Sequence, residues 1–156
     1  MGVSNRSVAA AAALLVVSAL APALAAPPQR DAERGVRRAL IRLNDLLGRR
    51  DIAIVDEFVA GEDTLLVGSL PTDSARGRPE LERHFRAYFE RPETFSFMWR
   101  EVDVAVRGGV AWLHAEGEVV IRGPDGDRRE PYRLTGVLEQ HHGKWLWRLF
   151  HGSQPA

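Results

Sequence analysis

The C-terminal part of the chain most constrains its fold, because its side chains alternate in the manner of two paired strands. Two alternating runs, residues 132–140 and 144–150, flank a turn that contains Gly143, which is typical of a long antiparallel hairpin. Strand side chains alternate between faces, so one face is expected to hold Trp145, Trp147, Leu149, His151 and Ser153. Arg133 and Thr135 of the first strand are expected to join them. Polar groups among tryptophans need either partners within the protein or a ligand.

The rest of the chain alternates between helical and strand patterns. Apolar side chains at helical spacing predict helices over residues 31–48, 51–61 and 79–91, with a short strand at 64–70 between the last two. From Thr94 onward the period is two, and a change of phase at Arg100 and Glu101 predicts a bulge. Helices followed by strands predict an α+β domain, a cone-shaped curved antiparallel sheet of about four to five strands covered on one face by three helices.

The first 25 residues are predicted to be a signal peptide. A basic Arg6 precedes an apolar run at residues 8–20, and the small-x-small pattern at 23–25 predicts cleavage after Ala25. The alternative is an uncleaved membrane anchor, although Pro22 interrupts the apolar stretch. We therefore expect a periplasmic or secreted protein that does not contact a membrane after cleavage, with a lead segment at 26–30 and one domain at 31–155.

Composition excludes several classes of protein. Lys and Arg number 21, as do Asp and Glu, so the formal net charge is +0 and a nucleic-acid partner is not expected. The chain has no cysteine and hence no disulfide. Adjacent His141 and His142 lie at a turn and point apart, so no metal is expected there. We expect no metal, nucleotide or flavin, and thus no cofactor.

The run RLTGVLEQHHGKWLWRLFHGSQP resembles the closing hairpin of SnoaL-like proteins in the nuclear transport factor 2-like superfamily. The Gly-Arg-Pro at 77–79 and the Phe-Ser-Phe at 95–97 agree with it, and the match covers residues 31–155. The resemblance implies a pocket between the curved sheet and the helices, and a dimer across the outer surface of the sheet. Its members include isomerases, cyclases, dehydratases, transport factors and oligomerisation modules, so fold leaves function open.

Six residues are candidates for the site. His151 is the candidate general acid/base, because imidazole can exchange a proton near neutral pH, although a core histidine is the alternative. Arg133 would bind a substrate carboxylate or form a structural ion pair with Asp56 or Glu57. The other candidates for ligand contact are Ser153 and Thr135, which can donate to an oxygen, and Trp99 and Trp147, which form pocket walls or core.

The opposite face of the strands is predicted to be an interface. Its apolar residues are Trp112, Val120, Leu134, Leu138, Leu146 and Phe150, and a patch of this breadth indicates a two-fold dimer. Together these features predict an exported domain that binds a small, largely apolar molecule in its cone pocket. It would be a cofactor-independent isomerase, dehydratase or hydratase, or alternatively a non-catalytic ligand-binding or dimerisation module.

Overall fold

The computed structural model describes residues 27–69 and 73–155, so the predicted signal peptide and its cleavage site lie outside the described residues. Residues 27–30, predicted as a lead segment, are already helical, because α1 spans Pro27–Gly48. Within the described ranges, each helix is too short or too polar to cross a membrane.

The predicted α+β class is confirmed, with helices and strands in nearly the expected order. After α1 come a 3-10 helix, η1 (Ile52–Glu57), and a second α-helix, α2 (Gly77–Phe89). The strands are β1 (Leu65–Val67), β2 (Ser74–Arg76), β3 (Thr94–Arg107), β4 (Val110–Gly123), β5 (Gly126–His141) and β6 (Lys144–Ser153). The sheet has six strands rather than four to five, because residues 74–76, expected in a loop, pair with β1.

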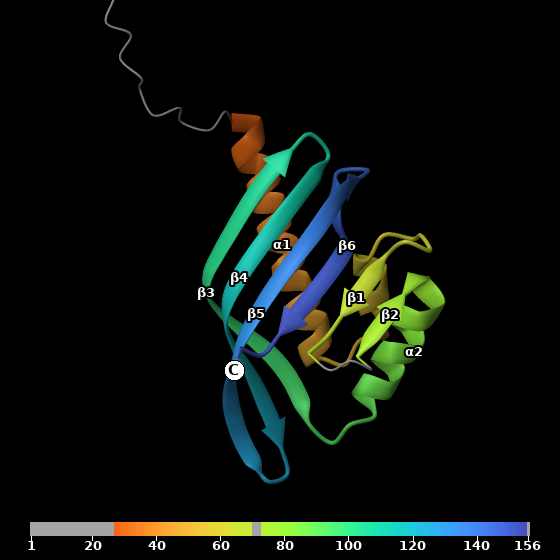
Figure 1. The fold of residues 1–156 in the computed structure, drawn as a ribbon, viewed down its shortest axis with the longest axis vertical. Helices are drawn as coiled ribbons and strands as arrows, with labels where there is room; N and C mark the ends of the chain where they lie inside the picture. The colour runs from red at the N-terminus through yellow and green to blue at the C-terminus, as the bar shows by residue number, and fades with distance from the viewer. Residues whose placement is uncertain (1–26, 70–72, 156) are drawn as a thin grey trace, which may run out of the picture.

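The strands form one curved sheet in the order β2-β1-β6-β5-β4-β3, and α1 runs behind its long strands while α2 lies beside the β1–β2 edge (Figure 1). Neighbouring strands are antiparallel except β1 and β6, which are parallel. The apolar stripe of α1, which includes Val36, Leu40 and Leu43, packs on the concave face. The predicted bulge is confirmed, since the β3–β4 register shifts between Trp99 and Glu101.

A second bulge, in β6, was not predicted and reverses the faces at the end of the chain. Leu138 pairs with Trp147 but the preceding Val137 pairs with Leu149, so Arg148 is the extra residue. Trp147 faces the core, and after the bulge Phe150 is buried while His151 is exposed. The prediction that Trp147 and His151 share a face is therefore wrong, because an inserted residue changes the phase of alternation.

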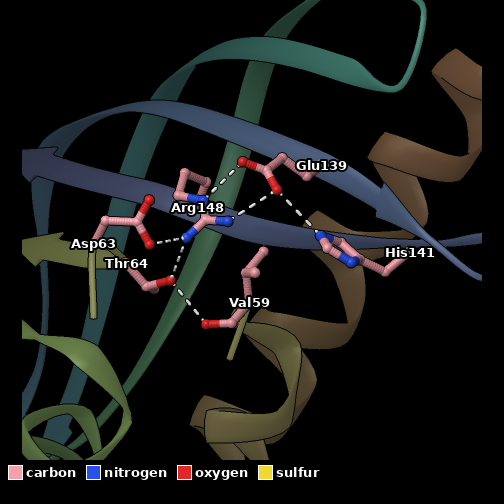
Figure 2. A network of polar contacts seen from close by, with 6 residues as sticks. All are labelled: Val59, Asp63, Thr64, Glu139, His141 and Arg148. Atoms are coloured by element: carbon pink, nitrogen blue, oxygen red, sulfur yellow. Dashed lines mark hydrogen bonds and ion pairs between the residues drawn. The ribbon is translucent and has the colours of Figure 1, made fainter. Parts of the chain in front are cut away.

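The side chain of Arg148 is held by carboxylates from two other parts of the chain (Figure 2). Its Nε and Nη2 donate to the two oxygens of Glu139 on β5, at 2.7 and 2.9 Å. Its Nη1 donates to Asp63 and, at 3.3 Å, to Thr64 Oγ1 in the segment before β1. His141 Nε2 lies 3.1 Å from Glu139. The bulged residue thus ties β6 to β5 and to the segment that leads into β1.

Acid should weaken this network. The hydrogen bond from Arg148, followed by that from His141, lowers the pKa of Glu139 below its ordinary value. A lowered folded-state pKa stabilises the fold above the unfolded-state pKa, and that stability is lost as pH falls through the folded-state pKa. We expect Glu139→Gln to reduce the free energy of unfolding by about 1 kcal/mol at pH 7, a value discounted for partial exposure. Urea unfolding should show this difference shrinking below about pH 4.

The matched control for this prediction is Glu82→Gln, since Glu82 pairs with Arg86 on the exposed surface of α2. Its expected effect is within about 0.5 kcal/mol at either pH. Equal losses for the two variants, or a Glu139→Gln loss that does not depend on pH, would contradict the role given to the network.

Several residues predicted to form the outer apolar patch are buried instead. Leu134, Leu138 and Phe150 belong to the core cluster under the helices, and Val120 is buried as well. Trp112 remains outside, where 48% of its surface is exposed. The strand alternation was correct locally, but the sequence did not show which of two apolar faces the helices would cover.

Candidate functional site

A small pocket opens between α2, η1 and the sheet. Its cavity volume is about 60 Å³, which is room for roughly four water molecules. Its walls are mainly apolar and aromatic, with Leu43, Phe58, Phe85, Phe97 and Phe150 among them. The polar side chains that line it are Asp73, His84, Tyr88 and Tyr132. Few polar groups within an apolar wall are typical of a ligand site.

Helix α2 supplies two of these polar groups. Gly77 begins the helix with a positive φ of 68°, and the backbone N–H of Arg76 donates to Glu80 Oε2 at 2.8 Å. The helix then places His84 and Tyr88 on one face, since residues four apart lie one turn apart. Their rings stack with centroids 6.1 Å apart. The side chain of His84 is 17% exposed.

Asp73 is the nearest acidic neighbour of His84 in the pocket. The distance between Asp73 Oδ1 and His84 Nε2 is 3.5 Å. Asp73 immediately precedes β2, and its backbone oxygen accepts a 2.5 Å hydrogen bond from the N–H of Gly68. A short two-stranded connection therefore places a carboxylate beside an imidazole that comes from the next helix.

The electrostatic setting favours the neutral forms of His84, Tyr88 and Tyr132 at physiological pH. Burial lowers the pKa of His84, and Arg91 acts in the same direction, while Asp73 opposes them. Burial also raises the pKa of Tyr88 and of Tyr132, and the charge of Asp73 adds to both increases. A neutral imidazole can accept a proton, and neutral phenols can donate hydrogen bonds to a developing negative charge. The pocket can thus support acid–base chemistry.

The sheet holds its side of the pocket through contacts with α1. Asn44 on α1 bonds both backbone groups of Phe97, accepting from its N–H at 2.7 Å and donating to its carbonyl oxygen at 3.3 Å. Phe97 in turn packs against Tyr132, with ring centroids 4.8 Å apart. These contacts fix the aromatic wall opposite α2.

The predicted polar site residues lie outside this pocket. His151 and Thr135 are exposed neighbours on the outer face, so the expectation that His151 faces the cavity is wrong, for the reason of the β6 bulge. Thr135 contacts His114 Nδ1 at 3.2 Å. Ser153 is opposite Arg133, which is also exposed and forms an ion pair at 3.0 Å with Glu116 instead of Asp56 or Glu57.

Neither of the two predicted tryptophans lines the pocket. Trp147 is a fully buried core residue, whereas Trp99 is partly buried against the core and packs on Phe97 with ring centroids 5.0 Å apart. Among the described residues, neither indole N–H has a hydrogen-bond partner.

Sequence reasoning missed Asp73 and His84. One signal was present, because His84 lies within the apolar stripe of its helix, between Leu81, Phe85 and Tyr88. No local pattern placed Asp73 beside it. In the part of the chain that the structure describes, no group of three or more acidic, histidine or cysteine side chains could hold a metal ion.

Comparisons with known proteins identify the family and the fold. A family model described as a SnoaL-like domain matches residues 36–156. A search of curated proteins gives no match.

Similar solved structures share the fold at low identity. One is an NTF2-like superfamily protein from Salmonella enterica serovar Typhimurium, with a TM-score of 0.71 and 14% identity over 81% of this chain and 93% of that one. Another is a "putative dehydratase from the NTF2-like family" from Streptomyces avermitilis, with a TM-score of 0.69 and 18% identity over 81% and 98%. A third is a "putative scytalone dehydratase" from Novosphingobium aromaticivorans, with a TM-score of 0.70 and 13% identity over 80% and 85%.

Proposed function

This chain belongs to the SnoaL-like family, and from that premise we propose that it is a cofactor-independent acid–base enzyme for a small, largely apolar molecule. The observation that carries the proposal is His84, held in an aromatic pocket 3.5 Å from Asp73 with two phenols beside it. Perturbed titratable groups that converge in a pocket are the usual mark of a catalytic site. His84 takes the role of general acid/base that the sequence had suggested for His151.

The reaction class best suited to these groups is elimination of water from a β-hydroxy ketone. His84 removes the proton next to the carbonyl, while Tyr88 and Tyr132 donate hydrogen bonds to the carbonyl oxygen as negative charge develops there. The carbon–oxygen bond of the hydroxyl group then breaks, a carbon–carbon double bond forms, and the proton on His84 completes the departing water. Asp73 stabilises the imidazolium that exists between the two steps.

Two further facts support dehydration over other acid–base chemistry. The reaction needs one group to take and return a proton together with donors for one oxygen, which matches the four polar side chains. Two structurally similar proteins are also named as dehydratases, although their identity to this chain is below 20%. The small cavity favours a substrate with a single ring or a short chain.

The proposal can be tested with a β-hydroxy ketone that carries one phenyl ring. Its dehydration gives a conjugated enone, whose absorbance should rise with catalytic rather than stoichiometric amounts of protein. Native mass spectrometry of the purified protein should also show a bound small molecule that is lost on denaturation. A folded protein that carries no ligand and converts none of a panel of such ketones would overturn the proposal. The same spectra test the proposed export, because cleavage would leave a chain that begins at Ala26.

We also propose that two copies associate through the outer face of the sheet. One row across four strands is apolar, with Trp112, Val137, Leu149 and Leu65 as successive cross-strand neighbours. The pair formed by Glu116 and Arg133 lies on the same face. A second copy related by a two-fold axis would therefore cover the exposed indole of Trp112 and place Glu116 of one copy opposite Arg133 of the other.

Sedimentation velocity at micromolar concentration should give about twice the mass of a ~14 kDa domain. Trp112→Glu should shift the protein to the monomer mass, because a charge would be buried at the centre of the interface. Ile41→Glu is the control, since Ile41 is 58% exposed on the helical side and should leave the dimer intact. A monomeric wild-type protein would contradict the interface.

A further inference from the structure

Two glycines lie next to polar groups of the pocket, Gly68 beside Asp73 and Gly152 beside Tyr132. Gly68 follows β1 and Gly152 is in β6, and the parallel register that pairs Val67 with His151 makes the next residues neighbours. Other glycines in the chain, such as Gly77 and Gly143, have a positive φ that side chains rarely adopt. Gly68 and Gly152 do not, so their backbone conformation does not require glycine.

The lack of room for a side chain, rather than the backbone conformation, explains why both positions are occupied by glycine. A Cβ on Gly152 would lie against the hydroxyl of Tyr132 and only 2.6 Å from its Cζ. A Cβ on Gly68 would overlap the carboxylate of Asp73 and lie 2.9 Å from its Cβ. Carbon atoms at such distances are far inside van der Waals contact. The two missing side chains thus leave a recess that the two oxygen-bearing groups occupy.

The two groups in this recess also interact with each other. Gly68, Asp73 and Tyr132 all line the pocket, and the charge of Asp73 contributes to the raised pKa of Tyr132. Asp73 reaches His84 from this position as well. A displacement of either oxygen would therefore alter the titration of its neighbours.

We propose that Gly68 and Gly152 are positioning residues, which seat the carboxylate of Asp73 and the hydroxyl of Tyr132 so that both face the ligand. The recess makes this end of the pocket the place where an oxygen substituent of the ligand binds, and the aromatic walls receive its apolar part. This assignment rests on the proposed function for its chemical meaning. Its test, however, requires no turnover.

The chain has only two tyrosines, Tyr88 and Tyr132, so tyrosinate absorbance in the ultraviolet reports on this site alone. In the wild-type protein both should ionise above the ordinary value of 10.0, since burial favours the neutral phenol. In Gly152→Ala, the new methyl group should displace the phenol of Tyr132 from its buried position. The ionisation of that phenol should then move to lower pH. Adding Tyr132→Phe should remove that transition and so assign it.

Gly109→Ala is the matched control, because a Cβ at Gly109 meets no atom within 4 Å and its φ is not positive. It should leave the tyrosine titration unchanged. Near-ultraviolet circular dichroism would establish that each variant is folded at each pH. A folded Gly152→Ala protein with the wild-type titration would overturn the assignment of Gly152.

Gly68→Ala provides a second test that does not depend on Gly152→Ala being folded. The three atoms nearest to its new methyl group all belong to the side chain of Asp73, which the methyl group would displace. Because Asp73 raises the pKa of both His84 and Tyr132, its displacement should lower both. Proton NMR of the His84 ring and tyrosinate absorbance measure the two shifts. If neither moves in the folded variant, Gly68 does not position Asp73, whether or not the protein is an enzyme.

Discussion

Replacing His84 by glutamine is expected to reduce kcat/KM for the phenyl β-hydroxy ketone by about 10²- to 10⁴-fold, the usual contribution of a positioned acid/base. Glutamine keeps the size and polarity of the side chain but cannot exchange the proton. The rate of enone formation, followed by absorbance, measures the loss. Asp73→Asn should also lower the rate, because it removes the charge that stabilises the imidazolium 3.5 Å away.

His151→Gln is the matched control for His84→Gln, since the two histidines differ mainly in where the fold places them. His151 is exposed on the outer face, so its replacement should leave the rate unchanged. In the wild-type protein, the rate should fall with acid only below the ordinary histidine pKa of 6.5, because burial lowers the pKa of His84. Loss of activity in His151→Gln with full activity in His84→Gln would refute the assignment.

Replacing Trp147 by alanine is expected to cost about 3–5 kcal/mol of stability, which is a large part of the roughly 5–15 kcal/mol typical of a domain. Trp147 is 0% exposed, and its ring packs edge-on against Phe150 with centroids 5.6 Å apart. It also fills the space over Gly136, where an added Cβ would lie 3.0 Å from its Cε3. Alanine would leave a cavity at the junction of β5, β6 and the helices.

Urea unfolding followed by circular dichroism should show this loss as a much lower midpoint, or as an unfolded protein at 25 °C. Ile41→Ala is the comparison, because Ile41 is 58% exposed and alanine favours a helix. That variant should unfold within about 0.5 kcal/mol of the wild type. Similar midpoints for the two variants would show that Trp147 does not make the predicted large contribution to the stability of the core.

Several features could be predicted because each depends on residues close together in the sequence. The helix at 31–48 follows from the spacing of its leucines, and the bulge near Arg100 from a change of phase in two apolar runs. The long closing hairpin follows from alternation on either side of a glycine turn. The resemblance to SnoaL-like proteins added the family, and that assignment is confirmed.

The site residues could not be predicted in the same way. The β6 bulge could not be recognised in the sequence, because the apolar residues do not change phase there. Arg148 lies between Trp147 and Leu149, where a polar residue of a regular alternating strand would also lie. What stabilises it is Glu139 from the neighbouring strand and Asp63 from before β1. Once the phase changes, His151 lies outside and Phe150 lies inside.

The sequence alone determined the class of fold, the order of its elements and the residues able to form a core, since helix and strand periods are properties of neighbouring residues. Tertiary structure alone decided which face of each strand the helices cover and which histidine enters the pocket. Asp73 and His84 come from separate elements, and their approach depends on how α2 packs beside β2. A catalytic arrangement of this kind is a set of distances between segments, and such distances arise only when the whole core has packed.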